Sequence, residues 1–236
     1  MKIKLIANGS GKWERLIHRW GVSFLIGEDV LFDTFGDPGV FLNNIHRFNI
    51  DIIKIKHIIV SQDDWDHISG LWYLVHDRKD ITVYICPGFR EDIKERIRSF
   101  GVRLVEVADS SLVKEDIYST GQLCSESEGR LIYEQSLIAK TAKGLVIITG
   151  CAHPGIISIV DNIRKKFNEN IHFLIGGLHL KDKTIAQIEE VISSLKSYNI
   201  EKIAPLHCTG EIAQRLFKEA YGDSCISLKI GETLEF

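Results

Sequence analysis

The order of the apolar segments constrains the fold of this chain more than any other feature of its sequence. In each half, short apolar runs joined by tight turns come first and strand–helix units follow. Val22–Ile26 and Val30–Asp33 flank the turn signal Gly27-Glu28-Asp29 and are typical of a hairpin. Hairpins imply antiparallel strands, whereas strand–helix units place helices on a sheet face. The sequence therefore predicts an α/β fold, a four-layer αββα sandwich with two packed sheets and helices outside.

Apolar spacing also predicts the individual elements. Helices are expected to begin near Pro38, Ile68, Glu91, Ile156, Ile185 and Ile212. Strands are expected at Lys2–Ala7, His57–Ser61, Ile81–Cys86, Arg103–Val107, Leu131–Ala139, Leu145–Thr149, Ile171–Ile175, Lys202–Leu206, Cys225–Ile230 and Thr233–Phe236. No linker rich in Pro, Gly or Ser divides the chain, so we expect residues 1–236 to form a single domain.

Composition excludes several classes of protein and of partner. With 44% hydrophobic and 26% charged residues the chain has ordinary globular composition, which excludes disorder and coiled coil. A net charge of −3 gives no basic footprint, so we expect no nucleic-acid partner. No long apolar window and no targeting segment are visible, which predicts a cytoplasmic protein with no membrane partner. Five cysteines cannot all pair, and the sequence does not indicate an oligomeric state.

The densest group of candidate functional residues follows the expected strand His57–Ser61. Asp63, Asp64, Asp66 and His67 lie within five residues, where a strand ends and a helix begins. Strand ends are common places for sites in α/β proteins. Taken alone, the cluster is as consistent with an exposed acidic turn that caps the helix.

Three further histidines occupy the same kind of position. His153, His179 and His207 each follow an apolar strand, and the carboxyl ends of strands in a sheet converge on one edge. Four such histidines beside an acidic cluster predict a metal or acid–base site. The other histidines are expected to be structural or solvated: His18, His46, His57, His76 and His172.

At these residues the sequence resembles a known family. The segment from Ser61 to Leu71 resembles the metallo-β-lactamase superfamily motif, Ser-His-x-His-x-Asp-His followed by a small residue, Gly and Leu. The segments from Gly150 to Gly155, from Gly176 to Leu180 and from Pro205 to Gly210 resemble the branch that includes archaeal dihydropterin–ribofuranosylaminobenzene-phosphate synthases. The resemblance covers nearly the whole chain and implies the fold of that superfamily.

The resemblance also implies roles for individual residues. His153 matches the third ligand of the first metal of the family, and Asp66, His67 and His207 match the ligands of the second metal. His179 matches a histidine at the substrate edge of the site. Asp33 matches a buried acid behind the motif that orients ligands.

One departure from the motif bears on metal binding. Its first two histidines are replaced by Gln62 and Asp64, and an amide oxygen is a weak zinc donor. One ion held by Asp66, His67 and His207 is favoured over two. A harder pair such as Mn or Fe, recruited by Asp64, and a degenerate metal-free site are the alternatives. Thiolates from the nearby Cys151 and Cys208 are a less favoured option, because small buried cysteines are common.

These residues predict a metal-dependent hydrolase that acts on a small-molecule substrate, with a phosphoester as one candidate. A bound divalent metal, zinc in the favoured case, activates water and polarises an oxygen. Asp64 or Asp66 would position that water or take its proton, and His179 would donate to a leaving-group oxygen. Two alternatives remain, a catalytically inactive binding protein with this fold and an enzyme like the pterin-precursor synthases.

Overall fold

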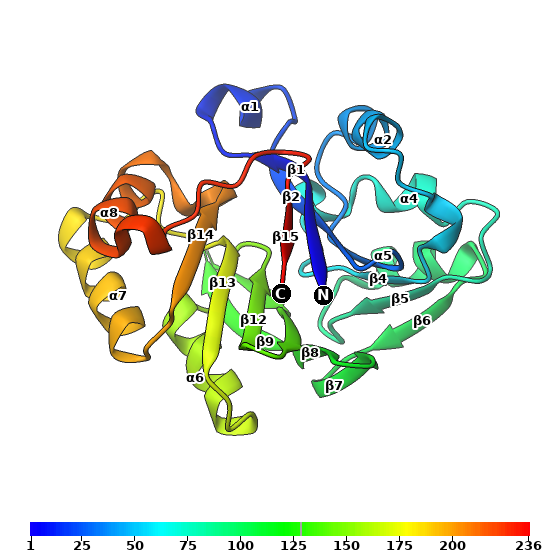
Figure 1. The fold of residues 1–236 in the computed structure, drawn as a ribbon. Helices are drawn as coiled ribbons and strands as arrows, with labels where there is room; N and C mark the ends of the chain where they lie inside the picture. The colour runs from blue at the N-terminus through cyan, green and yellow to red at the C-terminus, as the bar shows by residue number, and fades with distance from the viewer. Residues whose placement is uncertain (128) are drawn as a thin grey trace.

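Two β-sheets pack face to face in the computed structural model, which describes residues 1–127 and 129–236 (Figure 1). The two chain termini lie side by side at the middle of the sandwich, where the Met1 amino group donates to the Phe236 carbonyl oxygen. Helices cover the outer face of each sheet, which gives four layers (Figure 1).

The first sheet is built from the N-terminal half and closed by the last strand. Its described strands run in the order β15 (Thr233–Glu235), β1 (Lys2–Gly9), β2 (Gly21–Ile26), β3 (Val30–Phe32), β4 (His57–Ile59), β5 (Thr82–Ile85) and β6 (Arg103–Glu106). The helices of this half are α1 (Lys12–Leu16), α2 (Pro38–Arg47), the 3-10 turn η1 (Ile52–Lys54), α3 (Trp65–Ile68), α4 (Leu71–Leu74) and α5 (Glu91–Ser99). β3 to β6 are parallel, so their carboxyl ends share one edge.

The second sheet contains the C-terminal strand–helix units. Its described order is β14 (Lys202–Leu206), β13 (Ile171–Gly177), β12 (Gly144–Thr149), β11 (Leu137–Thr141), β8 (Ile117–Gly121) and β7 (Asp109–Lys114). A separate hairpin pairs β9 (Leu123–Ser127) with β10 (Arg130–Glu134). The helices are α6 (Ile156–Lys166), α7 (Ile185–Ser197) and α8 (Glu211–Tyr221), with 3-10 turns η2 (His207–Thr209) and η3 (Gly222–Ser224).

Separate apolar clusters hold the layers together. Phe24 and Phe173 belong to the cluster between the two sheets, Phe41 to the one under α2, and Phe217 to the one under α8. All four rings are almost completely buried, and burying such a side chain stabilises a fold by about 1.5–3 kcal/mol. The predicted αββα sandwich is therefore confirmed. No helix among the described residues is long and apolar enough to cross a bilayer.

Two of the strands predicted from the sequence do not form as continuous strands. Leu131–Ala139 is divided between β10 and β11, because the chain bends at Gln135, whose backbone N–H donates to the Ser61 carbonyl oxygen in the other half. Cys225–Ile230 forms only an isolated bridge to Ile203. Cys225 and Leu228 are buried by packing, without a ladder of hydrogen bonds, while Ile230 is exposed. The helix expected from Ile68 begins earlier and is broken into α3 and α4.

Candidate metal centre

The carboxyl ends of strands in both sheets bring the predicted site residues to one place. β12, β13 and β14 are parallel neighbours, and the chain leaves them just before His153, His179 and His207. Asp66 and His67 face them from α3, which follows β4 of the first sheet. Residues far apart in the sequence thus meet at one place, where Asp66, His153 and His179 line a cavity and His67 and His207 lie buried beside it.

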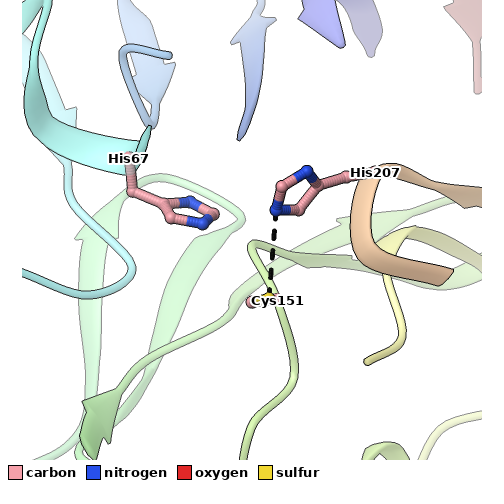
Figure 2. Close-up of side chains that lie close together, drawn as sticks. All are labelled: His67, Cys151 and His207. Carbon is pink, nitrogen blue, oxygen red and sulfur yellow. Dashed lines mark hydrogen bonds between the residues drawn. The ribbon is translucent and has the colours of Figure 1, made fainter. Parts of the chain in front are cut away.

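One close group of donor atoms comes from Asp66, His67 and His207. The Oδ2 atom of Asp66 lies 3.2 Å from Nε2 of His67 and 3.5 Å from Nε2 of His207. Both imidazole rings are fully buried, and they face one another above Cys151 (Figure 2). The sulfur of Cys151 lies 3.9 Å from Nε2 of His207. Donor atoms of His67, Cys151 and His207 all lie within 4.8 Å of one another.

Three of the four strand-end histidines are oriented in the same way. Nδ1 of His67 lies 2.6 Å from a carboxylate oxygen of Asp33, and Nδ1 of His153 lies 3.0 Å from Glu134. Nδ1 of His207 lies 2.8 Å from the Gly9 carbonyl oxygen. Carboxylate oxygens only accept, so Nδ1 of His67 and of His153 donates to them, and Nε2 of a neutral ring keeps its lone pair. Nδ1 of His207 also accepts from the Gly21 backbone N–H at 3.2 Å, so its two contacts fix the ring orientation without selecting one tautomer. Metal-binding histidines are usually held in this way.

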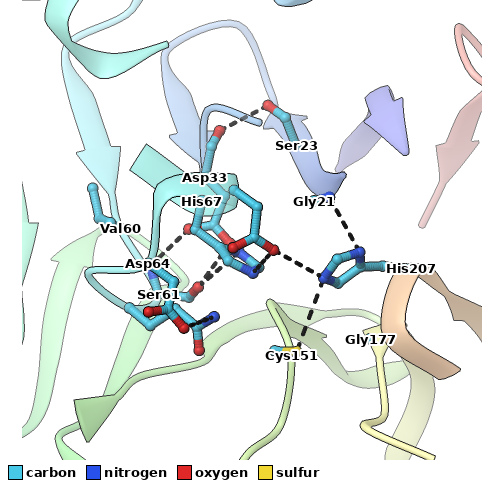
Figure 3. A network of polar contacts seen from close by, with 12 residues as sticks. Gly21, Ser23, Asp33, Val60, Ser61, Asp64, His67, Cys151, Gly177 and His207 are labelled. Carbon is cyan, nitrogen blue, oxygen red and sulfur yellow. Dashed lines mark hydrogen bonds and ion pairs between the residues drawn. The ribbon is translucent and has the colours of Figure 1, made fainter. Parts of the chain in front are cut away.

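Asp33 is the buried acid behind His67 (Figure 3). Its carboxylate accepts from the Ser61 backbone N–H and from the Ser61 hydroxyl, both at 2.7 Å, as well as from His67. The Ser23 hydroxyl donates to the Asp33 carbonyl oxygen. This network ties the ring of His67 to β2, β3 and the end of β4. The structure thus gives Asp33 the contacts that the sequence resemblance implies.

The charges in this group stabilise one another. Burial opposes ionisation of Asp66, yet the neighbouring rings of His67 and His207 hold its pKa below the ordinary value. Burial disfavours protonated His67, but the carboxylates of Asp66 and Asp33 raise its pKa well above that of a free imidazole. Burial raises the pKa of Asp33 even though His67 opposes the shift. A positive charge is therefore favoured between these carboxylates, and metal binding would release the proton.

Two buried polar atoms at the cavity have no hydrogen-bond partner among the described residues. They are Nε2 of His67, which makes only the ion-pair contact to Asp66, and Oε1 of Gln62. Such atoms are rare in native structures and call for a ligand, ion or water. The donors around His67 are two imidazoles, a carboxylate and a thiol, a set that suits zinc. The residues present therefore fit a divalent metal at Asp66, His67 and His207.

The residues assigned to the first metal are arranged differently. Asp64 accepts from Arg130 at 2.6 Å through Oδ1, and the Gln62 amide lies 3.4 Å from its Oδ2. His153, like Asp66, belongs to neither group of three clustered donors found among the described residues, and its ring nitrogen Nδ1 contacts Glu134, whereas Asp66 contacts the rings of His67 and His207. The structure brings Gln62, Asp64 and His153 to one cavity but does not cluster them as a ligand set.

Glu134 is a buried residue of the site that the sequence analysis missed. It is 1% exposed and accepts from the backbone N–H groups of Cys151, Ala152 and His153 as well as from the His153 ring. Burial opposes its ionisation, but the His153 hydrogen bond and charge hold its pKa below the ordinary value. The sequence signal that could have identified Glu134 is the polar run Glu134-Gln135-Ser136, which interrupts an otherwise apolar strand pattern.

A second group of donors lies beside the first on the second-sheet wall. Cys151, His179 and Cys208 have their donor atoms within 4.8 Å of one another. Both cysteines are about 5% exposed and pack against Trp20. Burial opposes thiolate formation, but Cys151, His207 and His179 together lower the pKa of Cys208 well below the ordinary thiol value. The structure thus places both thiols among the candidate donors of the site, a role that the sequence alone made the less favoured option.

The cavity between the two walls has a volume of about 310 Å³. Asp66, Cys151, His153, His179 and Cys208 line it, together with Gln62, Asp64, Trp20 and Trp65. Its remaining lining side chains are charged: Arg15, Arg130, Lys181, Asp182 and Lys183. Four cations beside a metal-type donor set would suit an anionic small molecule.

The backbone is strained where these side chains leave their strands. Asp33, Ala152, His179 and His207 have positive φ angles between 47° and 65°. Each such conformation costs a non-glycine residue on the order of 1–3 kcal/mol and is typical of functional sites. Gly21 is required nearby, because a Cβ there would lie 1.9 Å from the Asp66 carbonyl oxygen. Close packing of β2 against α3 thus fixes the position of Asp66.

Comparison with other proteins identifies relatives of the whole chain. No protein-family model matches it. It is 28% identical, over 92% of its own length and 90% of the relative's, to the 7,8-dihydropterin-6-methyl-4-(β-D-ribofuranosyl)-aminobenzene-5′-phosphate synthase of Methanocaldococcus jannaschii. An uncharacterised protein of that organism is 27% identical over 88% of this chain and 90% of its own.

Solved structures give the same answer for the fold. A metal-dependent hydrolase of the β-lactamase superfamily superposes with a TM-score of 0.81 at 26% identity, covering 100% of this chain and 99% of that one. The metallo-β-lactamase fold protein YhfI of Bacillus subtilis superposes with a TM-score of 0.70 at 14% identity, covering 99% and 98%. The resemblance to the metallo-β-lactamase superfamily is therefore confirmed, in fold and, at 26–28% identity over most of the chain, in sequence.

Proposed function

We propose that this chain is a metal-dependent hydrolase of small anionic molecules, with a phosphoester as the substrate class. One ion would be held by Asp66, His67 and His207. The observation that carries the proposal is that the Nε2 atoms of two buried histidines with fixed Nδ1 contacts lie within 3.5 Å of one carboxylate oxygen of Asp66, which lines a cavity with cations around it. Similarity to a metal-dependent hydrolase of the superfamily supports the reaction class.

A divalent ion at these residues supplies a water of lowered pKa and polarises a phosphoryl oxygen. The protein holds the ligands in place, with Asp33 behind His67 and the Gly9 carbonyl oxygen behind His207. Asp66 would also accept the proton of the attacking water. Zinc is favoured, because the donors near Asp66 are nitrogen and sulfur. Manganese or iron would need Asp64, which is paired with Arg130.

The cations around the cavity would bind the substrate. Arg130 lines the cavity, and its guanidinium donates to the carboxylate of Asp64, which also lines the cavity. Asp64 would therefore position the Arg130 guanidinium for substrate binding. Lys181 lies over the ring of Trp20 on the opposite wall. Hydrogen bonds from charged groups to phosphate oxygens are stronger than neutral ones. His179, which also lines the cavity, would donate a proton to the leaving oxygen.

Hydrolysis of p-nitrophenyl phosphate and bis(p-nitrophenyl) phosphate by zinc-reconstituted protein tests this function. We expect turnover that His67→Ala abolishes and that His76→Ala, a change at an exposed histidine far from the site, leaves intact. No turnover of either ester with zinc, manganese or iron would contradict the proposal. Bound metal without turnover would favour a binding protein that keeps the cavity.

The synthase relative favours a second candidate function. It is 28% identical over most of the chain, so this protein would catalyse a related condensation of a dihydropterin with a ribofuranosylaminobenzene phosphate. The altered positions Gln62 and Asp64 argue against identical chemistry. Formation of the condensed product by the purified protein, followed by mass spectrometry, would support this candidate, and its absence would remove it.

The double substitution Gln62→His plus Asp64→His separates an active hydrolase from an inactive binding protein. If the wild-type chain is a hydrolase, it turns over phosphoesters before any change. If phosphodiesterase activity appears only in the double variant, the wild-type chain is a binding protein with the ancestral cavity. Zinc content measured on both proteins shows whether the two histidines add an ion.

A further inference from the structure

Cys151, His179 and Cys208 form a cluster that the proposed hydrolase mechanism does not use as ligands. They follow β12, β13 and β14, which are neighbours in the second sheet. We propose that these three side chains form a second metal site, for zinc or another soft divalent cation, beside the ion at Asp66, His67 and His207. It goes beyond the proposed function, because it concerns different ligands and an additional ion.

The geometry of the cluster suits a metal with sulfur ligands. The sulfur of Cys151 lies 2.9 Å from that of Cys208 and 3.5 Å from Nδ1 of His179. All three donor atoms lie within 4.8 Å of one another, close enough to contact one ion after small adjustments. Two thiolates and one imidazole are a known zinc ligand set that leaves one position open. All three residues line the cavity, so that position would face the cavity.

Cys151 connects the two sites. Its sulfur belongs both to the group with His67 and His207 and to the group with His179 and Cys208. Thiolate ligands are soft and suit zinc better than carboxylate or amide oxygens do. The positions where the superfamily motif has two histidines hold Gln62 and Asp64, and the thiols occupy the opposite wall of the same cavity. Sulfur donors would thus replace the missing nitrogen donors.

The other cysteines of the described chain serve as comparison. Cys86 is buried near the Ser61 carbonyl oxygen, Cys225 is buried under α8, and Cys124 is exposed. None of these three belongs to a clustered donor group among the described residues. Only Cys151 and Cys208 face histidine nitrogens in the cavity, so ordinary core packing of a small thiol does not account for their placement.

X-ray absorption at the zinc edge tests the site without relying on activity. Reduced wild-type protein loaded with zinc alone should show sulfur neighbours at about 2.3 Å together with nitrogen or oxygen at about 2.0–2.1 Å. Cys208→Ser should lower bound zinc from about two equivalents to about one and remove most of the sulfur signal. Cys124→Ser is the matched control and should change neither quantity.

Two further measurements keep the proposal falsifiable. Cobalt loaded into reduced wild-type protein should give the thiolate charge-transfer absorption, which requires no substitution to fold. In the double variant Asp66→Asn plus His67→Ala the first site is lost, yet the sulfur signal of zinc should remain. This arm separates failure of the proposed hydrolase site from failure of the thiolate site.

A spectrum of reduced, zinc-loaded wild-type protein with only nitrogen and oxygen neighbours would overturn the proposal. So would an unchanged zinc content in a folded Cys208→Ser variant. Formation of a Cys151–Cys208 disulfide that persists in reducing buffer and prevents metal binding would overturn it as well. Retention of sulfur neighbours only in variants that keep Cys151 and Cys208 would support it.

Discussion

The two walls of the cavity carry different donor chemistry. The first-sheet wall, between Ser61 and His67, offers the imidazole of His67 and the carboxylates of Asp64 and Asp66, whereas Asp63 pairs with Arg90 outside the cavity lining. The second-sheet wall, at the ends of β12 to β14, offers three imidazoles and two thiols. Only Asp66 and His67 of the first wall reach donors of the second. Most of the candidate nitrogen and sulfur donors therefore lie on the second wall, and in the proposed site Asp66 and His67 of the first wall would complete the ligand set.

The difference follows from what lies behind each wall. Asp33 holds His67 through a fully buried network, whereas Asp64 is turned toward Arg130 at the rim. Buried partners fix a ligand, and an exposed ion pair is worth little and is screened by salt. In the proposed function, the first wall would therefore contribute one rigidly held ligand, His67, and a rim at Asp64 and Arg130 that binds substrate.

Loss of a ligand from either wall should have the largest effect. His67→Ala on the first wall and His207→Ala on the second should each lower the affinity for the ion and the phosphoester turnover by more than about 100-fold. Loss of a residue that only hydrogen-bonds to a ligand costs about 10- to 100-fold, and loss of the ligand itself should cost more. The measurements are metal content after dialysis against zinc buffer and kcat/KM. If either variant keeps wild-type affinity, the site is not shared between the walls.

The acids behind the ligands should have a smaller and unequal effect. Asp33→Asn should weaken metal affinity about 10- to 100-fold, because it releases the ring of His67. Glu134→Gln should weaken it less than about tenfold, because Glu134 holds His153, which is not one of the proposed ligands Asp66, His67 and His207. Isothermal titration with zinc measures both. Equal losses of zinc affinity in the two variants would indicate that His153 is also a ligand, and would contradict the proposed difference between the two walls.

Substitution of the cations that line the cavity should weaken substrate binding and leave kcat unchanged. Arg130→Ala and Lys181→Ala should each raise KM for a phosphoester about tenfold, the loss of one charge-assisted hydrogen bond. KM for a neutral ester of the same size should change little. Lys143→Ala, in the turn between β11 and β12, is the control for general charge effects. Equal changes for charged and neutral esters would show that these residues do not bind the anion.

The smallest expected effect concerns pH and His57, on β4 behind the first wall. Burial lowers the pKa of His57, against the pull of Asp29, so the folded state disfavours the protonated ring. Stability is then complete above the unfolded value of about 6.5 and declines as pH falls toward the lower folded value. Urea unfolding at pH 7.5 and 5.5 should show a smaller decline for His57→Gln than for wild type. An equal decline would assign the pH effect to other groups.

The sequence predicted the fold well because the fold depends on apolar order. Hairpins, strand–helix units and the strand ends that carry His153, His179 and His207 follow from local patterns that the structure reproduces. Leu131–Ala139 was mispredicted because a strand interrupted by a polar bend shows nearly the same apolar alternation as a continuous strand. Cys225–Ile230 was mispredicted because a segment that packs beside a strand without pairing to it shows that alternation too. Local sequence does not record which partner strand a segment finds.

The contacts of the site were harder to predict than its location. Asp66, His67 and His207 converge as the resemblance implied, since topology brings strand ends together. Glu134 escaped notice because it acts through backbone N–H groups and a ring from a different segment. The pairing of Asp64 with Arg130 joins residues 66 positions apart, and no local pattern encodes it.

Anomalous diffraction at the zinc edge from crystals of zinc-loaded protein tests the central claim most directly. The account predicts a peak in contact with Asp66, His67 and His207, and its loss in His67→Ala crystals. A peak bounded by Gln62, Asp64 and His153 with none at His67, or no peak in the cavity at all, would contradict it.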